Sequence, residues 1–338
     1  MFFACKSNIF NLYLQYYFLI KLIINFEHFF NIKFNLLKSY STIDKFKANF
    51  KTVVTIGTFD GVHIGHRFIV NHLNKTAKRV GGESVLLTFS PHPRFVLYGD
   101  DSQLKLLDTL YEKKEKLKEI GLQNFVVQNF SKEFSRMKYV DFVRNILVKK
   151  LNVDHLVIGY DHHFGRNREG SINELKDLSV LYNFTLEQIP PQKEGKVSVS
   201  STKIRKLIQD GNIKEANKFL GHQYLIIGQV VHGNKLGRTI NYPTANIEVE
   251  KQKLIPKAGV YAVQLELSSL TYYGMLNIGI QTNKIEVHIF NFAEEIYGEE
   301  LKIQFVCRVR DGMDFEDISL LRKQLEKDEK KCTSLLGI

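Results

Sequence analysis

Short apolar runs alternate with amphipathic stretches over the first two thirds of the chain. Four apolar and β-branched runs have the length and composition of buried strands: 51–59, 84–89, 124–127 and 155–158. Four stretches carry helical periodicity or helix-start and helix-stop signals: 66–80, 105–120, 201–211 and 212–220. Strands that alternate with helices predict an α/β fold with a doubly wound parallel sheet.

The pattern changes after Gly221-His222. Five strand-like runs follow one another, separated by turns that contain glycine or asparagine: 224–232, 259–267, 272–278, 285–292 and 301–309. Helical periodicity returns at 315–330. Successive strands without intervening helices predict an antiparallel β-barrel with a C-terminal helix. We therefore expect an α/β domain at 36–222 and a barrel domain at 223–338.

The first 35 residues differ from both regions. They contain eight of the 25 phenylalanines, and their apolar stretches are interrupted by Lys21 and Glu27. The segment has neither a small-residue cleavage site nor a clean span of about 20 apolar residues. Three interpretations stay open: a start assigned upstream of the true one, which we favour, a membrane-associating helix, or an extension packed on the core.

Composition narrows the classes of ligand. The 338 residues carry a formal net charge of +11, but the lysines are interspersed with acidic residues and no arginine-rich block occurs. This favours small phosphate-bearing ligands over nucleic acid. Cys5, Cys307 and Cys332 form no C-x-x-C pair, which indicates neither a disulfide framework nor a zinc cluster. We expect a cytoplasmic protein without stable nucleic-acid or membrane association; the sequence carries no signal for an oligomeric state.

The most informative segment joins the first predicted strand to the first predicted helix. It reads G-T-F-D-G-V-H-I-G-H from Gly57 to His66. At such a junction, backbone N–H groups and the helix dipole favour an anion. Gly61 and Gly65 let a phosphate approach the backbone, and His63 and His66 can donate hydrogen bonds to it. The alternative is two loop histidines beside turn glycines; zinc binding would need a third ligand that the sequence does not place nearby.

A second segment, S-V-S-S-T-K-I-R, opens the third predicted helix. Ser200, Ser201 and Thr202 are natural N-cap residues, and capping alone can explain them. The functional alternative is that their hydroxyl and N–H groups hold ATP phosphates, with Lys203 or Arg205 neutralising the leaving pyrophosphate.

Two further loops carry a resemblance to a known family. T-F-S-P-H-P-R follows the strand predicted at 84–89, and G-Y-D-H-H-F-G follows the strand predicted at 155–158. Together with H-x-G-H and S-S-T-x-I-R, in this order, they resemble the adenylyltransferase half of prokaryotic bifunctional riboflavin kinase/FAD synthetases. The resemblance implies that FMN is adenylylated by ATP to FAD, with release of pyrophosphate.

The same resemblance implies roles for individual residues. His63 and His66 would be catalytic. The ATP and its phosphates would be bound by Gly57, Phe59, Asp60, Gly61, Gly65, Ser200, Ser201, Thr202 and Arg205. The flavin and adenine sites would be shaped by Pro91, His92, Pro93, Asp161, Phe164 and Gly165.

The barrel region has its own motifs. A basic turn, V-H-G-N-K-L-G-R, contains Gly233, Gly237 and Arg238, and its backbone N–H groups can cradle phosphates. Thr244 and Asn246, in Y-P-T-A-N, offer the hard oxygen ligands that Mg²⁺ prefers. Downstream, a predicted strand carries the carboxylate that a kinase acting on an alcohol needs as a base: Glu286. Taken singly, each motif is equally explained as a hairpin turn, a Pro-Thr turn or a solvent-facing glutamate.

In this order, G-x-x-x-G-R, P-T-A-N, E-V-H-I-F and I-Y-G resemble the riboflavin kinase barrel. The resemblance spans residues 39–330 in total and implies a bifunctional enzyme that converts riboflavin to FMN and FMN to FAD, with ATP as co-substrate and Mg²⁺. Thr244 and Asn246 would hold Mg-ATP, Gly233, Gly237 and Arg238 would contact its phosphates, and Glu286 would activate the ribityl hydroxyl.

Two positions depart from the family pattern. Asn241 stands where the family usually has glycine, and asparagine tolerates a left-handed backbone. The loop Ile280–Lys284 is shorter than the Pro-Thr loop that usually precedes the catalytic glutamate. Two rival interpretations therefore stay open: a monofunctional FAD synthetase with an impaired barrel, and a non-catalytic flavin- or RNA-binding regulator.

Overall fold

The computed structural model describes residues 37–99, 103–160, 165–166, 169–191, 193–194, 197–233, 236–282 and 284–338. Residues 38–338 form one compact unit. The expectations for residues 1–35 lie outside the described residues, as do those for Asp161 and Phe164.

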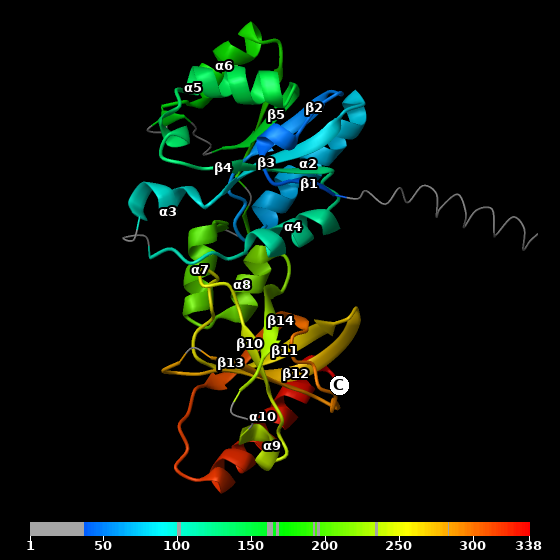
Figure 1. Cartoon of the computed structure of the whole chain (residues 1–338), viewed down its shortest axis with the longest axis vertical. Coiled ribbons are helices and arrows are strands. Elements are labelled where there is room, and N and C mark those ends of the chain that lie inside the picture. The colour runs from blue at the N-terminus through cyan, green and yellow to red at the C-terminus, as the bar shows by residue number, and fades with distance from the viewer. Residues whose placement is uncertain are drawn as a thin grey trace, which may run out of the picture. The chain divides into compact units, whose positions relative to one another are not determined.

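A six-stranded parallel sheet forms the first part of this unit (Figure 1). Its strands are β1 (Lys38–Tyr40), β2 (Thr52–Ile56), β3 (Glu83–Ser90), β4 (Asn124–Asn129), β5 (Val153–Gly159) and β6 (Thr185–Ile189). The order is β1-β4-β3-β2-β5-β6, and every neighbouring pair is parallel. The chain leaves β2 toward β3 and β4 on one side and places β5 and β6 on the other. The topological switch point therefore lies between β2 and β5, and the doubly wound fold is confirmed.

Helices and short turns connect these strands. They are η1 (Ile43–Lys45), α2 (Ile64–Val80), α3 (Pro93–Tyr98), α4 (Leu110–Glu119), η3 (Phe134–Arg136), α5 (Tyr139–Phe142), the π-helical η4 (Val143–Lys150) and α6 (Ile172–Leu181). A small hairpin follows β6 and consists of β7 (Lys193–Glu194) and β8 (Val197–Ser198). All five residues of β2 are buried, as expected for a central parallel strand covered on both faces.

The helix predicted at 105–120 begins five residues later than expected. Thr109 caps α4: its hydroxyl accepts the Glu112 N–H at 3.1 Å, and the Glu112 carboxylate accepts the Thr109 N–H at 2.8 Å. Residues 105–108, here called the strap, are not helical because their N–H groups have tertiary partners. The Leu106 N–H, for example, donates to the Gln252 carbonyl at 2.8 Å.

Two helices precede the barrel, α7 (Ser201–Gln209) and α8 (Ile213–Leu220), as the sequence predicts. They share one apolar core with the barrel, in which Ile204 and Phe219 lie with Tyr224, Tyr261 and Phe305. The boundary at 222 falls at the change from helix to barrel. Its role as a domain boundary stays a prediction.

A closed antiparallel barrel of six strands forms the second part. The strands are β9 (Tyr224–Val231), β10 (Ala245–Glu248), β11 (Gly259–Leu267), β12 (Leu270–Ile278), β13 (Ile285–Ile289) and β14 (Glu300–Asp311). Their order around the barrel is β10-β13-β12-β11-β14-β9. On β13, Ile285, Val287 and Ile289 are buried in the barrel core, so Glu286 and His288 face outward. The predicted barrel is confirmed.

Three details of the barrel differ from the sequence-based expectation. β10 was missed, because it is short and directly follows Pro243-Thr244. The strand predicted at 285–292 ends at Ile289, since Asn291 adopts a left-handed turn with φ 54°. The C-terminal helix α10 (Ile318–Leu336) runs six residues beyond the predicted end and terminates at left-handed Gly337. A one-turn helix, α9 (Leu236–Thr239), lies between β9 and β10.

A buried ion pair joins α4 to the barrel. Lys253 and Glu112 have fully buried side chains, with 2.7 Å between Nζ and Oε2. Glu112 also accepts the Ile227 N–H at 2.8 Å, and Lys253 also donates to the carbonyls of Leu107 and Leu225 at 2.5 and 2.6 Å. Both charges are thus surrounded by hydrogen-bond partners, the condition for burying an ion pair at tolerable cost.

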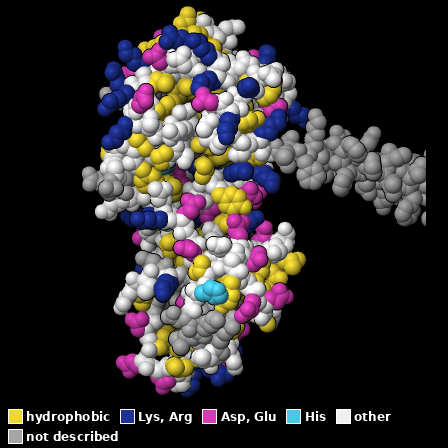
Figure 2. Space-filling model, in the orientation of Figure 1, with side chains coloured by type: hydrophobic (Ala, Val, Ile, Leu, Met, Phe, Trp, Pro, Cys, Tyr) yellow, Lys and Arg dark blue, Asp and Glu magenta, His cyan; other side chains and the backbone are white. Residues whose placement is uncertain are grey.

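Surface charge and helix apolarity in the described residues concern the kinds of partner that the protein can contact. Figure 2 shows basic side chains interspersed with acidic and apolar ones over the sheet and its helices. Among the described residues, no helix combines the length and apolarity that a membrane crossing requires.

Candidate active sites

The segment from Gly57 to His66 forms a loop at the carboxyl end of β2 and the first turn of α2. His63 is the N-cap of α2, and its Nδ1 accepts the His66 N–H at 3.3 Å. The loop contains three left-handed residues: Phe59, Gly61 and Val62, with φ of 47°, 89° and 39°. Phe59 and Val62 are buried and hold this conformation by packing, which turns the loop sharply at the switch point of the sheet.

His63 and His66 form an aromatic stack beneath this loop. Their ring centroids lie 3.6 Å apart with an interplanar angle of 13°, and Phe59 stacks on His66 at 4.5 Å. Burial lowers the pKa of His63 to about 4 and lowers that of His66 well below its usual range. Both rings are therefore neutral at pH 7. Because Nδ1 of His63 is an acceptor, its Nε2 carries the proton and can donate.

We expect acid to destabilise the fold through such histidines. Burial lowers the pKa of His63, His92 and His222 to about 4, whereas the unfolded chain titrates near 6.5. The unfolded state therefore binds more protons, and stability falls as the pH falls from 6.5 toward 4. The urea concentration at the midpoint of unfolding should be lower at pH 5.5 than at pH 7.5. The His92→Gln variant should show a smaller decrease between the two pH values than the wild type. Equal midpoints at both pH values would contradict this.

Asp60 ties the loop to two other segments. Its carboxylate accepts the N–H groups of Leu107 and Asp108 in the strap, at 3.1 and 3.0 Å, and pairs with the Arg205 guanidinium. Arg205 also donates from Nε to the Lys105 carbonyl at 2.9 Å. The predicted phosphate contacts of Asp60 and Arg205 remain predictions, and in this structure the two side chains hold the loop, the strap and α7 together.

The S-S-T segment lies against the same loop. Ser200 caps α7, accepting the Lys203 N–H at 3.3 Å, and the Ser201 hydroxyl donates to the Asp60 carbonyl at 2.8 Å. Thr202 is exposed. Of the two candidate cations, Lys203 lies over the ring of Phe219, with Nζ 4.4 Å from the centroid.

The other two predicted loops follow the strands on either side of β2. Pro91 and His92 lie between β3 and α3, and Pro93 is the first residue of α3. His92 caps α3 by accepting the Arg94 N–H at 3.2 Å. Gly165, left-handed with φ 76°, follows β5 and packs so closely on Tyr139 that a Cβ would lie 2.9 Å from its Cβ. The loops therefore start from the carboxyl ends of three adjacent strands, β3, β2 and β5.

The barrel brings its predicted residues together on the outward face. Asn246 on β10 is paired with Glu286 on β13, which is paired in turn with Asn277 on β12. Residues paired in this way project their side chains on the same face. Thr244 directly precedes β10 and is exposed. A Cβ at Gly233 would lie 2.0 Å from Nδ2 of Asn246, so only glycine lets the basic turn approach that amide.

Two hydrogen bonds hold the turn that contains Pro243 and Thr244. The Tyr242 hydroxyl donates to Glu329 on α10 at 2.8 Å, and Nδ1 of His288 donates to the Pro243 carbonyl at 2.8 Å. Gly237 packs beneath this turn, since a Cβ there would lie 2.1 Å from the Tyr242 carbonyl oxygen. The Arg238 side chain lies outside the described residues.

The two departures from the family pattern are also visible. Asn241 is left-handed, with φ 61°, so it adopts the conformation expected of the family glycine. Between β12 and β13, the Gly279 N–H donates to the Lys284 carbonyl at 3.0 Å, which closes the short loop into a tight turn. Ile280 on this turn is half exposed.

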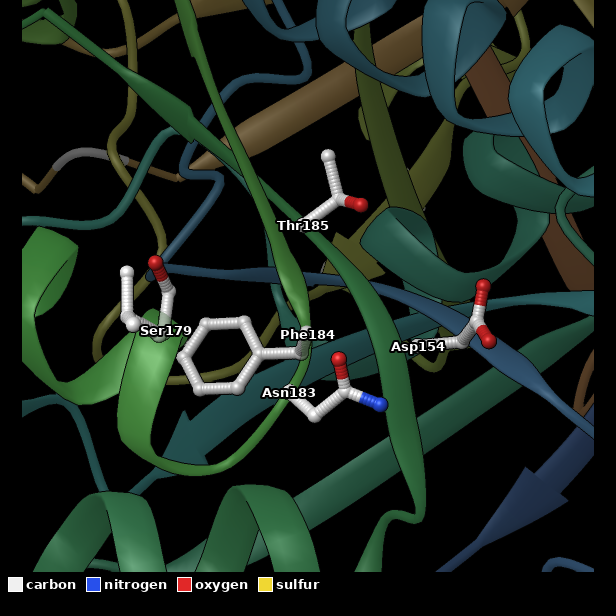
Figure 3. Close-up of a pocket in the computed structure, with 6 residues that line it drawn as sticks. Asp154, Ser179, Asn183, Phe184 and Thr185 are labelled. Carbon is white, nitrogen blue, oxygen red and sulfur yellow. The ribbon is translucent and has the colours of Figure 1, made fainter.

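A pocket of about 470 Å³ lies at the opposite edge of the sheet (Figure 3). It is lined by Asp154, Ser179, Val180, Asn183, Phe184 and Thr185, near the amino ends of β5 and β6. Asp154 is already paired with Lys51 at 2.9 Å and His155 at 2.7 Å. Because α/β sheets bind ligands at the carboxyl ends of their strands, this pocket is separate from the candidate sites.

Two family models match separate parts of this chain. Residues 45–203 match the FAD synthetase family model and residues 220–336 match the riboflavin kinase model. A Listeria monocytogenes protein named bifunctional riboflavin kinase/FMN adenylyltransferase is 39% identical over 82% of this chain and 90% of its own. This chain belongs to that family. A Bacillus subtilis member is 33% identical over 83% of this chain and 92% of its own.

A solved structure supports the fold. A Streptococcus pneumoniae protein described as a macrolide-efflux protein is 32% identical to this chain, with a TM-score of 0.78. The match covers 87% of this chain and 98% of the Streptococcus pneumoniae chain. This chain therefore shares its fold with a protein whose description names another activity.

Proposed function

We propose that this chain catalyses both reactions of its family, phosphorylating riboflavin to FMN in the barrel and adenylylating FMN to FAD at the switch point of the sheet. The observation that carries the proposal is that each motif set assembles into a site of its own. Three loops leave the carboxyl ends of β3, β2 and β5. Asn246 and Glu286 are direct neighbours on the outward face of the barrel.

At the adenylyl-transfer site, an oxygen of the FMN phosphate attacks the α-phosphorus of ATP and pyrophosphate leaves. The nucleophile is already ionised, so the protein supplies position and charge stabilisation. Neutral His63 and His66 donate N–H groups to the phosphates, and Gly61 and Gly65 give the backbone access to them. Asp60 keeps the loop in place by holding the strap.

At the kinase site, the ribityl hydroxyl oxygen attacks the γ-phosphorus of ATP, the bond to the β-phosphate oxygen breaks, and ADP leaves. The Glu286 carboxylate accepts the hydroxyl proton. Thr244 and Asn246 fit a Mg²⁺ site, since a hydroxyl and an amide oxygen are hard donors. Glycine at 233 lets the basic turn pack against the Asn246 amide. When bound, Mg²⁺ neutralises charge on the ATP phosphates. His288 and Glu329 fix the turn that carries Thr244.

The test uses the whole chain with riboflavin, ATP and Mg²⁺, reading FMN and FAD by chromatography. Both products should appear in sequence. FAD from supplied FMN without any FMN from riboflavin would leave only the FAD synthetase activity.

The tight turn at 279–284 should weaken riboflavin binding more than it slows the chemistry. Replacing Ile280–Lys284 with the longer Pro-Thr loop of the family should lower the KM for riboflavin. The kcat should change by no more than about twofold, because the base and metal ligands are untouched. An insertion of equal length at Ser268-Ser269, the β11–β12 turn, is the control. An unchanged KM would show that the loop does not contact the flavin.

A further inference from the structure

The buried side chain of one lysine, Lys113, has no hydrogen-bond or ion-pair partner among the described residues. Lys113 on α4 is 6% exposed, yet among the described residues no side chain or carbonyl accepts a hydrogen bond from its Nζ. Its neighbours on the helix behave differently. Glu112 pairs with Lys253 at 2.7 Å and Lys116 pairs with Asp108 at 2.5 Å. Lys113 therefore stands out on a helix face whose other buried charges are neutralised.

The charges around it leave a surplus. Three buried carboxylates lie in this region, each with its own cation: Asp60 with Arg205, Asp108 with Lys116, and Glu112 with Lys253. Lys113 is a fourth cation facing three anions.

Its position places that surplus at the adenylyl-transfer site. The Asp60 carboxylate accepts hydrogen bonds from two N–H groups in the strap, immediately before α4. The first turn of α4 therefore lies against the loop at 57–66. Lys113 lies within electrostatic reach of Asp60 and Asp108, which act to raise its pKa. It in turn helps to lower the pKa of His66 and of His92.

Desolvation by burial lowers the pKa of Lys113, and the nearby carboxylates of Asp60 and Asp108 offset this only in part. An anion bound beside it offsets the cost of that desolvation and keeps the ammonium charged. The anions that the proposed reaction brings to this site are the phosphates of ATP and FMN. A lysine contacts such a group as a compact positive charge with three donors.

We propose that Lys113 is a phosphate-binding residue of the adenylyl-transfer site, whose ammonium contacts the triphosphate of ATP beside His63 and His66. The inference rests on the proposed function. As the FMN oxygen bonds to the α-phosphorus and the bond to the β-phosphate oxygen breaks, negative charge moves onto pyrophosphate. The Lys113 ammonium stabilises that charge without giving up a proton.

Lys113→Met tests this, because methionine nearly matches the length and removes the charge. We expect kcat/KM for FAD formation to fall about 10- to 100-fold, the effect of losing one charged hydrogen bond. The KM for ATP should rise more than the KM for FMN. FMN formation from riboflavin should not change, because the barrel site contains none of these residues. Lys118→Met, an exposed lysine on the same helix, is the matched control and should alter neither reaction.

Thermal unfolding separates a binding role from a structural one. Since Lys113 has no partner in the described part of the chain, Lys113→Met should melt at or above the wild-type temperature while FAD formation falls. A lower melting temperature with a parallel loss of both activities would overturn the proposal, as would normal FAD formation. A rise confined to the KM for FMN would assign the ammonium to the FMN phosphate and not to ATP. Failure of the wild type to make FAD from FMN would instead reject the proposed function itself.

Discussion

Replacing His66 with alanine is expected to reduce FAD formation about 10³-fold while FMN accumulates from riboflavin. The His66 ring lies between Phe59 and His63 at the switch point of the sheet, and its loss removes both an N–H donor and one layer of the stack. The barrel residues proposed for the kinase reaction lie on other elements. Steady-state assays with riboflavin and with FMN as separate substrates give both rates from one protein.

His72→Ala is the matched control for His66→Ala. His72 lies on the same helix two turns further along and pairs with Glu187 at 2.8 Å, near the surface. It should leave both rates close to wild type. If His66→Ala stops both reactions in a folded protein, the two activities do not have separate sites and the division argued above is wrong.

Glu286→Gln should lower the kcat for FMN formation by about 10²-fold or more, as expected for removal of a positioned base. Glutamine keeps the size and the strand register with Asn246 but cannot accept the hydroxyl proton. FAD formation from supplied FMN should be unaffected. The measurement is kcat with saturating riboflavin and Mg-ATP, so that a change in binding is not mistaken for a change in chemistry.

Glu266→Gln provides the control for the barrel. Glu266 also projects from a strand and pairs with Lys302 at 2.9 Å, but its strand β11 carries none of the proposed site residues. Its replacement should not change kcat. A Glu286→Gln variant with wild-type kcat would remove Glu286 as the base and leave the rest of the barrel site in question.

The sequence predicted the positions of the candidate loops best where they follow the ends of strands. The loops after β2, β3 and β5 could be placed because each follows a run of buried apolar residues, and the carboxyl ends of parallel strands meet at one edge. Asn246 and Glu286 were identified as separate motifs. Their pairing could not be predicted, because β10 is only four residues long and its register depends on closure of the barrel.

Charge was the least reliable guide. The lysines and glutamates at 112–116 have the composition of a solvated helix face, yet Glu112, Lys113 and Lys116 are buried. Their partners Lys253 and Asp108 come from the barrel and the strap, so sequence spacing contains no signal for them. The strap was predicted as part of the helix. Its hydrogen-bond partners are distant in sequence, so no local pattern indicated that it would leave the helix. A capping signal at Thr109 with Glu112 could have placed the helix start correctly.

The barrel has its proposed site residues on the outside and its apolar packing on the inside, and this affects which substitutions the chain tolerates. Glu286 and His288 alternate with Ile285, Val287 and Ile289, so neighbouring codons face different selection. Exchanges among aliphatic residues of similar volume inside cost little, about 1.5 kcal/mol or less. The interior can therefore exchange isoleucine and leucine with little loss of stability. The proposed kinase reaction would instead restrict exchanges at Glu286, in the outward row.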